Sequence, residues 1–306
     1  MRIACIGEAM VELRVPTGSD GTGIGFAGDT LNTAIYLARA LGPSHEVAFV
    51  SVVGQDALSD RMAAFIAAEG VSVTHLFRHA TRLPGIYAIA TDAAGERTFS
   101  YWRENSAARC LFDGVQDDLK SAMQRFDVVY FSAITLAIIS PVARERLLAW
   151  LADFRKDGGL VAFDSNYRPR LWPDGDVARD IIERAWRLCD IALPSVDDEM
   201  ALFGDPDPQA VLTRFAGYGA KVGALKRGAE GPLPIGGAGP AVQNYASAPQ
   251  IIDTTAAGDS FAGGFLGTYL TTGDLDRAMA AGHEFARRVI GYPGAIVPRA
   301  VWDITE

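Results

Sequence analysis

The stretch "DTTAAGDSFAGGF", residues 253–265, places two carboxylates around a run of small residues and then turns apolar. Threonine is a common N-terminal cap of a helix, so Thr254 or Thr255 is expected to begin a buried helix here. Asp259 then falls inside the first turn of that helix. An acid in such a place is either a well-placed negative charge or a carboxylate that does chemistry.

The residues between the two acids favour the chemical interpretation. The backbone N–H groups of Ala256, Ala257 and Gly258 would lie at the positive end of the helix, and their small side chains would let a phosphate approach. A carboxylate beside bound phosphate suits a general base that removes a proton from an attacking hydroxyl. The alternative is a capped helix with an exposed acid at position 259.

Composition limits the classes of protein to consider. The 306 residues are 49% apolar and 21% charged, which is typical of a soluble globular enzyme with a large core. The net charge of −9 argues against a nucleic-acid surface, so an anionic ligand would need local arginines. The three cysteines show neither pairing nor metal spacing, and no apolar run is long enough to cross a membrane. We therefore expect a cytoplasmic protein that binds neither nucleic acid nor membrane.

Short apolar runs alternate with longer helical patterns such as residues 29–41 and 142–155. This alternation predicts an α/β fold in which helices flank a mostly parallel central sheet. Ligands of such sheets bind beyond the carboxyl ends of the strands. The expected buried strands lie within residues 3–7, 47–54, 128–134, 160–164, 191–195 and 222–228.

One segment departs from this alternation. Residues 85–91 and 97–103 read as two aromatic strands joined by a turn around Ala94 and Gly95. The hairpin would form either a lid over the ligand edge of the sheet or an antiparallel extension of it. With no repeat or linker in the chain, residues 1–306 are treated as one domain, with a small lid from about 11–27 and 82–105.

Two glycine-containing motifs near the N-terminus differ in how strongly they predict a ligand site. The run "GIGFAG", residues 23–28, matches a dinucleotide-binding pattern, but more than ten residues separate it from the first expected strand. It is therefore weak support for an oxidoreductase. In "GDTLN", residues 28–32, Asp29 or Thr30 would serve as a helix cap, or Asp29 and Asn32 would face a hydroxyl-rich ligand.

Arginines occur where the fold would present groups to a ligand. Arg103 ends the hairpin beside Tyr101, and Arg168 follows an expected strand, with Arg170 two residues further on. Two such arginines suit the bidentate recognition of a carboxylate. They predict an acidic substrate in spite of the negative net charge.

Taken together, "GDTLN", "DTTAAGDSFAGGF" and the intervening hairpin resemble the ribokinase-like (PfkB) carbohydrate kinases across essentially the whole chain. Within that family, "RLPGIYAIATD", "GERTFSYWRENSAA", "DSNYRPRLW" and "LPSVDDE" resemble the members that act on 2-keto-3-deoxygluconate. The resemblance implies a ribokinase-like fold and transfer of the γ-phosphate of ATP, with Mg²⁺, to the 6-hydroxyl of that sugar acid.

The resemblance also implies roles for individual residues. Asp259 would be the base, and the backbone of Ala256, Ala257 and Gly258 would form the anion hole. The remaining roles are sugar contacts by Gly28, Asp29, Asn32 and Tyr87; carboxylate contacts by Tyr101, Arg103 and Arg168; nucleotide contacts by Ser195, Lys226, Gly228, Gly231 and His283; and an indirect magnesium contact by Glu199.

The chain departs from the family pattern at three places. Ala27 and Ala256 stand where the family has glycines, and Val196 stands where an asparagine precedes the metal-linked glutamate. The last departure makes the magnesium contact of Glu199 the least supported of these roles.

Other functions remain open at this stage. A kinase for 2-keto-3-deoxygalactonate differs only in the orientation of one hydroxyl, whereas one for fructose, ribose or a nucleoside would leave Arg103 and Arg168 without an anion. A silent sugar-acid sensor would not need Asp259. Because the aromatic side chains of the hairpin cannot all cover substrate, we also expect a homo-oligomer that pairs through the lid.

Overall fold

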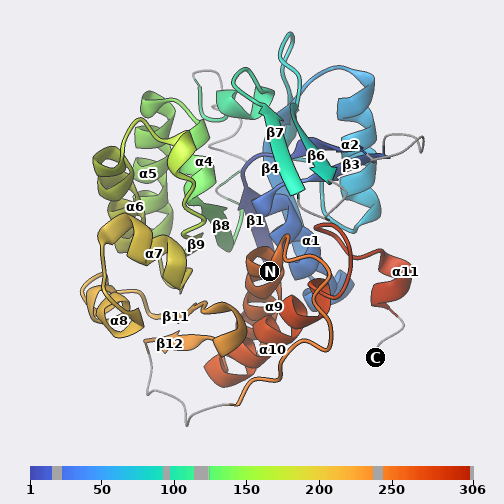
Figure 1. The fold of residues 1–306 in the computed structure, drawn as a ribbon. Coiled ribbons are helices and arrows are strands. Elements are labelled where there is room, and N and C mark those ends of the chain that lie inside the picture. Colours follow the sequence, from blue (N-terminus) through green and yellow to red (C-terminus); the bar gives the residue numbers. More distant parts are fainter. Residues whose placement is uncertain (16–22, 92–96, 114–122, 124, 237–243, 304–306) are drawn as a thin grey trace.

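The computed structural model describes the whole chain except residues 16–22, 92–96, 114–122, 124, 237–243 and 304–306. A sheet of eight strands forms the centre, in the order β12-β11-β10-β9-β8-β1-β4-β5 (Figure 1). Only β12 runs antiparallel to its neighbour. These strands are β1 (Arg2–Ile6), β4 (Glu46–Val53), β5 (Leu76–Arg78), β8 (Val128–Ser132), β9 (Leu160–Asp164), β10 (Ile191–Leu193), β11 (Val222–Leu225) and β12 (Leu233–Ile235).

Helices cover both faces of this sheet and connect its strands. Among the longer helices, α5 and α6 lie on one face of the sheet, and α1, α9 and α10 lie on the other face (Figure 1). The helices are α1 (Asp29–Leu41), α2 (Ala57–Ala68), α4 (Ala133–Ile138), α5 (Pro141–Lys156), α6 (Gly175–Leu188), α7 (Val196–Phe203), α8 (Pro208–Ala216), α9 (Ala257–Thr272), α10 (Leu275–Val289) and α11 (Arg299–Trp302).

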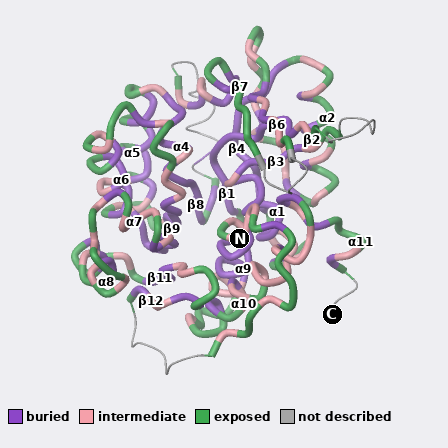
Figure 2. The backbone as a smooth tube through the Cα atoms, viewed as in Figure 1, coloured by how far each residue is buried: buried purple, intermediate pink, exposed green. Residues whose placement is uncertain are grey.

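Alternate residues of each central strand enter different cores. In β8, for example, Val129 and Phe131 pack with α5 and α6, whereas Val128 and Tyr130 pack with α1 and α9. Strands that are buried on both faces need continuous apolar runs, and such runs are what the sequence contains. All six strands expected from these runs are present, and the buried backbone traces them through the centre of the molecule (Figure 2).

The expected hairpin forms a second, four-stranded sheet in the order β3-β2-β6-β7. Its strands are β2 (Met10–Val15), β3 (Gly23–Ala27), β6 (Gly85–Thr91) and β7 (Arg97–Trp102). Because β2 pairs with β6 in parallel, two segments distant in sequence close into one lid. The turn expected around Ala94 and Gly95 lies outside the described residues.

The same sheet excludes the dinucleotide interpretation of residues 23–28. Gly23 to Ala27 form strand β3, which pairs antiparallel with β2 in the lid, rather than a turn that cradles a pyrophosphate. The extended backbone of β3 pairs with β2 along its length and does not form the tight turn that the dinucleotide motif needs. Among the described residues, no helix is both long and apolar enough to span a bilayer.

Candidate active site

A cavity of about 570 Å³ opens at the carboxyl edge of the large sheet, beneath the lid. The ends of β9, β10 and β11 form one side of it, and the first turns of α1 and α9 form the other. Its lining brings together most of the residues predicted from sequence. These are Gly28, Asp29, Asn32, Tyr87, Tyr101, Arg168, Ser195, Lys226, Gly228, Ala256, Ala257, Gly258, Asp259 and His283.

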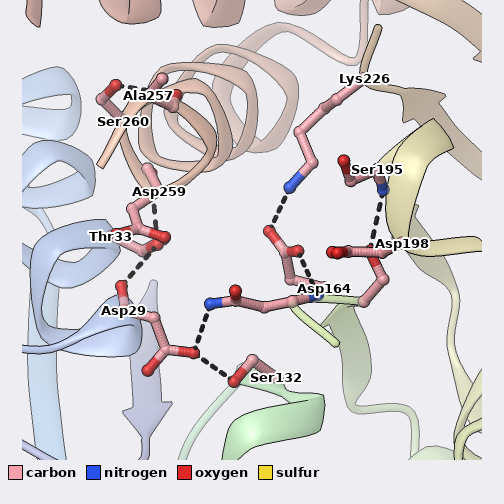
Figure 3. A network of polar contacts seen from close by, with 12 residues as sticks. Asp29, Thr33, Ser132, Asp164, Ser195, Asp198, Lys226, Ala257, Asp259 and Ser260 are labelled. Carbon is pink, nitrogen blue, oxygen red and sulfur yellow. Dashed lines mark hydrogen bonds and ion pairs between the residues drawn. The ribbon is translucent and has the colours of Figure 1, made fainter. Parts of the chain in front are cut away.

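Asp259 lies in the first turn of α9 (Figure 3), where it is half-buried and lines the cavity. Its Oδ2 accepts a hydrogen bond of 2.8 Å from Asn32 Nδ2, which fixes the direction of the carboxylate. Burial foremost, and then the charge of Asp29, raises the pKa of Asp259 to about 8. A carboxylate with such a pKa is a much stronger base than an exposed one, as proton removal from an alcohol requires.

The start of α9 differs from the expectation of a threonine cap. Ala256 occupies the cap position with φ 61° and ψ 17°, and no side chain caps the helix. The preceding turn is instead held by Asp253, whose carboxylate accepts from the N–H groups of Thr255 and Gly294. The N–H of Ala257 donates to the carbonyl of Thr254, so Gly258 and Asp259 supply the first-turn N–H groups that need an external acceptor.

The left-handed conformation of Ala256 leads to a stability prediction. A side chain in the left-handed conformation costs about 1–2 kcal/mol, and replacing Ala256 with Gly removes that cost. Part of the gain is offset because glycine has more conformational entropy to lose on folding. We expect the free energy of unfolding in urea to rise by about 0.5–1 kcal/mol. Ala257, at the next position, has ordinary helical geometry, so Ala257→Gly is expected to lower the free energy of unfolding. Equal effects of the two changes would contradict the account.

Asp29 begins α1, on the same side of the cavity as Asp259. The cap position of this helix is Gly28, and no side chain caps it, so the carboxylate of Asp29 is available for other contacts. Its Oδ2 accepts hydrogen bonds from Ser132 Oγ and from Asn166 Nδ2, the latter at 2.9 Å (Figure 3). Burial raises the pKa of Asp29 against the effect of these bonds. The arrangement suits a carboxylate that accepts a hydrogen bond from a sugar hydroxyl.

The two arginines predicted to bind a carboxylate have different environments. Arg168 lies at the cavity wall with 54% of its side chain exposed, and its Nη1 is 3.6 Å from Asp198 Oδ1. Arg103 is buried, does not line the cavity, and forms an ion pair with Glu8. Arg168 is therefore placed to meet a ligand, while a ligand contact by Arg103 stays a prediction.

The pairing of Arg103 predicts a structural role. Glu8 is only 1% exposed, so Arg103→Met would leave a buried carboxylate without its counter-ion. We expect a loss of about 3–5 kcal/mol in the free energy of unfolding. The double variant Glu8→Gln/Arg103→Met removes the isolated charge and should recover much of this loss. Chemical denaturation of both variants measures the difference; a mild single variant would show that the pair is not needed.

Four of the five predicted nucleotide residues line the same cavity. Ser195 follows β10, Lys226 and Gly228 follow β11, and His283 projects from α10. The ring of His283 bonds the carbonyl of Ala246 at 2.8 Å. Gly231 adopts φ 76° and does not line the cavity, so its nucleotide contact stays a prediction.

Glu199 lies outside the cavity. Its side chain is 1% exposed, with Oε2 bonded to Arg214 Nη2 at 2.9 Å and Oε1 to the indole of Trp186 at 3.2 Å. Burial raises the pKa of Glu199 to about 8, against the influence of Arg214. A magnesium contact by Glu199 would require this network to open, and it too stays a prediction.

Four functional residues escaped the sequence analysis. Asp164, Asn166 and Asp198 line the cavity, and Ser132 positions Asp29. Asp164 ends the buried run of residues 160–164 and Asn166 follows it, so their place at the carboxyl end of a strand was the available signal. Ser132 ends β8 and had the same signal, but its role depends on Asp29, which is 103 residues away in the chain.

Comparison with known proteins defines the class to which this fold and cavity belong. Residues 1–301 match the family described as pfkB family carbohydrate kinase. The chain belongs to that family, and the predicted ribokinase-like fold is confirmed.

The chain is also similar to individual members of the family and to solved structures. The chain is 42% identical over 305 residues to the 2-dehydro-3-deoxygluconokinase of Escherichia coli (strain K12), covering 97% of each chain. A solved PfkB protein from Polaromonas sp. JS666 superposes with a TM-score of 0.83 at 28% identity, covering 100% of this chain and 99% of that one. A ribokinase II from E. coli, solved with ATP and Mg²⁺, gives a TM-score of 0.82 at 22% identity, covering 96% and 94%.

Proposed function

We propose that this chain transfers the γ-phosphoryl group of ATP to the 6-hydroxyl of 2-keto-3-deoxygluconate. The observation that carries the proposal is the shared cavity: Asp259, at the start of α9, lines it together with the residues expected to contact the sugar and most of those expected to contact the nucleotide. The name of the 42% identical relative supports the choice of substrate, since 2-dehydro-3-deoxygluconate and 2-keto-3-deoxygluconate are the same compound.

The residues of the cavity divide the work of the reaction. Arg168 provides the positive charge that an acidic sugar needs, and Asp29 and Asn32 provide a hydrogen-bond acceptor and donor for its hydroxyls. Asp259 takes the proton of the 6-hydroxyl as the oxygen attacks phosphorus. The N–H groups at the start of α9 meet the negative charge on the transferring group, where the helix dipole favours an anion.

Magnesium is part of the proposal through the nucleotide. Within the described part of the chain, no three metal-binding side chains cluster closely enough to hold an ion by themselves. Mg²⁺ usually takes only one or two protein carboxylates together with phosphates and water, so this donor set fits a nucleotide-bound ion. Asp198 is the carboxylate we assign to it, since it faces the cavity where Glu199 does not. The ion would neutralise phosphate charge.

Identification of the product tests the proposed chemistry. Incubation with MgATP and 2-keto-3-deoxygluconate should give ADP and one phosphomonoester, whose phosphorus NMR signal is split by the two protons of carbon 6. A product phosphorylated on a secondary carbon would overturn the positional assignment. ADP that forms without a sugar phosphate would overturn the transfer itself.

The galactonate epimer is the second substrate that the cavity favours. It carries the same carboxylate for Arg168 and the same primary hydroxyl for Asp259, and it differs in one hydroxyl orientation only. A neutral sugar gives Arg168 no anion to bind, so fructose and ribose fit less well. A silent sensor would have no use for a buried base with a raised pKa.

The lid supports a proposal of self-association. Val15, Ile24 and Trp102 are each 43–58% exposed on the small sheet and do not line the cavity, so the substrate does not account for these apolar side chains. We propose that two copies pair through this sheet in a reducing, cytoplasmic setting, which suits the three free cysteines. A monomer by light scattering at micromolar concentration would contradict the pairing.

A further inference from the structure

Lys226 and Asp164 form an ion pair inside the cavity, and the nucleotide contact expected of Lys226 does not explain this pairing. Lys226 Nζ lies 2.5 Å from Asp164 Oδ2, and the two side chains are 11% and 4% exposed (Figure 3). Lys226 follows β11 and Asp164 ends β9, so the pair spans the carboxyl edge of the sheet. An enclosed pair costs desolvation energy and is weak evidence for stability alone, which makes a functional reason worth seeking.

The carboxylate of Asp164 is held firmly. Its Oδ1 accepts from the backbone N–H of Asn166 at 3.2 Å, and its Oδ2 also accepts from the hydroxyl of Tyr130 at 3.4 Å. Burial, together with nearby carboxylates, raises the pKa of Tyr130, so this hydroxyl stays protonated and remains a donor. A fixed carboxylate in turn fixes the ammonium group that pairs with it.

The ammonium group of Lys226 lies beside the anion hole. A Cβ placed on Gly258 would be 3.5 Å from Lys226 Nζ, and Gly258 directly precedes Asp259 in the first turn of α9. The positive end of the helix and a positive side chain therefore face the same small volume. Both fields favour an anion in that volume, and under the proposed function the transferring phosphoryl group would be that anion.

We propose that Lys226 is a catalytic residue that binds the oxygens of the phosphoryl group during transfer, and that Asp164 is a positioning residue that aims Lys226 there. This rests on the proposed kinase function and deepens it. In the step, the sugar O6–H bond breaks with its proton going to Asp259, and a bond forms from O6 to the γ-phosphorus. The bond from that phosphorus to the bridging oxygen breaks, and its electron pair leaves with ADP. Lys226 keeps its proton throughout.

Asp164 has a second consequence for the base. Because it retains the ammonium group, Lys226 does not form an ion pair with Asp259, the neighbouring cavity carboxylate. Without Asp164, Lys226 would be able to pair with Asp259 and weaken it as a base. The negative charge of Asp164 also acts on Asp259 directly and favours its protonated form. The retention of Lys226 and the charge of Asp164 both keep the pKa of Asp259 raised.

The test compares Lys226→Met, Asp164→Asn and the control Lys221→Met. Lys221 lies just before β11, outside the cavity, and its partner Asp190 keeps a second partner in Arg155. We expect Lys226→Met to lower kcat on the order of 10²-fold, as the loss of one transition-state donor does, while the KM for the sugar acid changes little. Asp164→Asn should lower kcat less and move the acid limb of the pH profile to lower pH. The control should match the wild type.

A binding measurement separates this role from general nucleotide binding. MgADP with aluminium fluoride imitates the transferring group, whereas MgADP alone does not. Lys226→Met should weaken the fluoroaluminate complex by about the factor lost in kcat while MgADP binds nearly as before. Equal weakening of both, or an unchanged kcat, would overturn the proposal. If the single variant does not fold, Lys226→Met/Asp164→Asn removes the isolated buried charge, and the same two affinities decide.

The outcomes also separate this inference from the proposed function. Wild-type protein that shows no sugar-acid phosphorylation contradicts the proposed function itself. Wild-type turnover with no selective loss of fluoroaluminate binding in Lys226→Met contradicts only the role of Lys226.

Discussion

Replacing Asp259 with Asn is expected to lower kcat by about 10²–10⁴-fold, the range that a positioned general base contributes. The amide is nearly the same size and can still accept the hydrogen bond from Asn32, so the cavity keeps its shape. What it cannot do is take the proton of the attacking hydroxyl. Steady-state kinetics with MgATP and the sugar acid measure the change, and a kcat within a few-fold of the wild type would contradict the role of Asp259.

The acid–base behaviour of Asp259 adds two controls. Because the base works only when ionised and its pKa is raised to about 8, the wild-type rate should fall as the pH drops below that value. The folding stability changes with pH in the opposite direction to the rate. A carboxyl with a raised pKa in the folded state withdraws stability as the pH rises from about 4 towards 8. Asp259→Asn should therefore unfold at a higher urea concentration than the wild type at pH 8, and show no excess at pH 4.

Replacing Arg168 with Met is expected to raise the KM for the sugar acid by about 10–100-fold, with a smaller change in kcat. A hydrogen bond to a charged group is worth about 1.5–3 kcal/mol, and the loss of such a contact to the substrate carboxylate accounts for the factor. The guanidinium donates to the carbonyl of Tyr167 at 2.9 Å and lies near Asp198, and its exposure leaves room for it to turn towards a ligand. Kinetics at varied sugar-acid concentration measure the effect.

Arg170→Met provides the matched control for Arg168. Arg170 is also exposed, lies two residues away and does not line the cavity, so its removal should leave the KM unchanged. The two variants remove the same charge from the same loop. An equal rise in KM for both would mean that the net charge of the loop matters and that Arg168 makes no specific contact.

The central sheet was predictable because its strands are buried on both faces and therefore need continuous apolar runs. Residues 128–134 and 160–164 show this most plainly, as β8 and β9. The lid hairpin was predictable for a related reason, since its strands alternate between two faces. What both share is a pattern that can be read within a few neighbouring residues.

The start of α9 and the ion-pair partner of Arg103 were not predictable in the same way. Thr254 and Thr255 have the chemistry of caps, but Asp253 holds the turn through Gly294, which is 41 residues away. Arg103 has the chemistry of a carboxylate clamp, but the carboxylate beside it is that of Glu8, 95 residues away. Such pairings are set by tertiary packing, which no local pattern contains.

The most direct test of the central claim is ADP release with MgATP against a panel of acceptors. The panel holds 2-keto-3-deoxygluconate, its galactonate epimer, gluconate, fructose, ribose and adenosine. The account predicts strong turnover on the keto-deoxy acids alone, because they combine a carboxylate for Arg168 with a primary hydroxyl for Asp259. Comparable or faster turnover on a neutral sugar would keep the fold and the base but contradict the assignment of Arg168 and of the substrate.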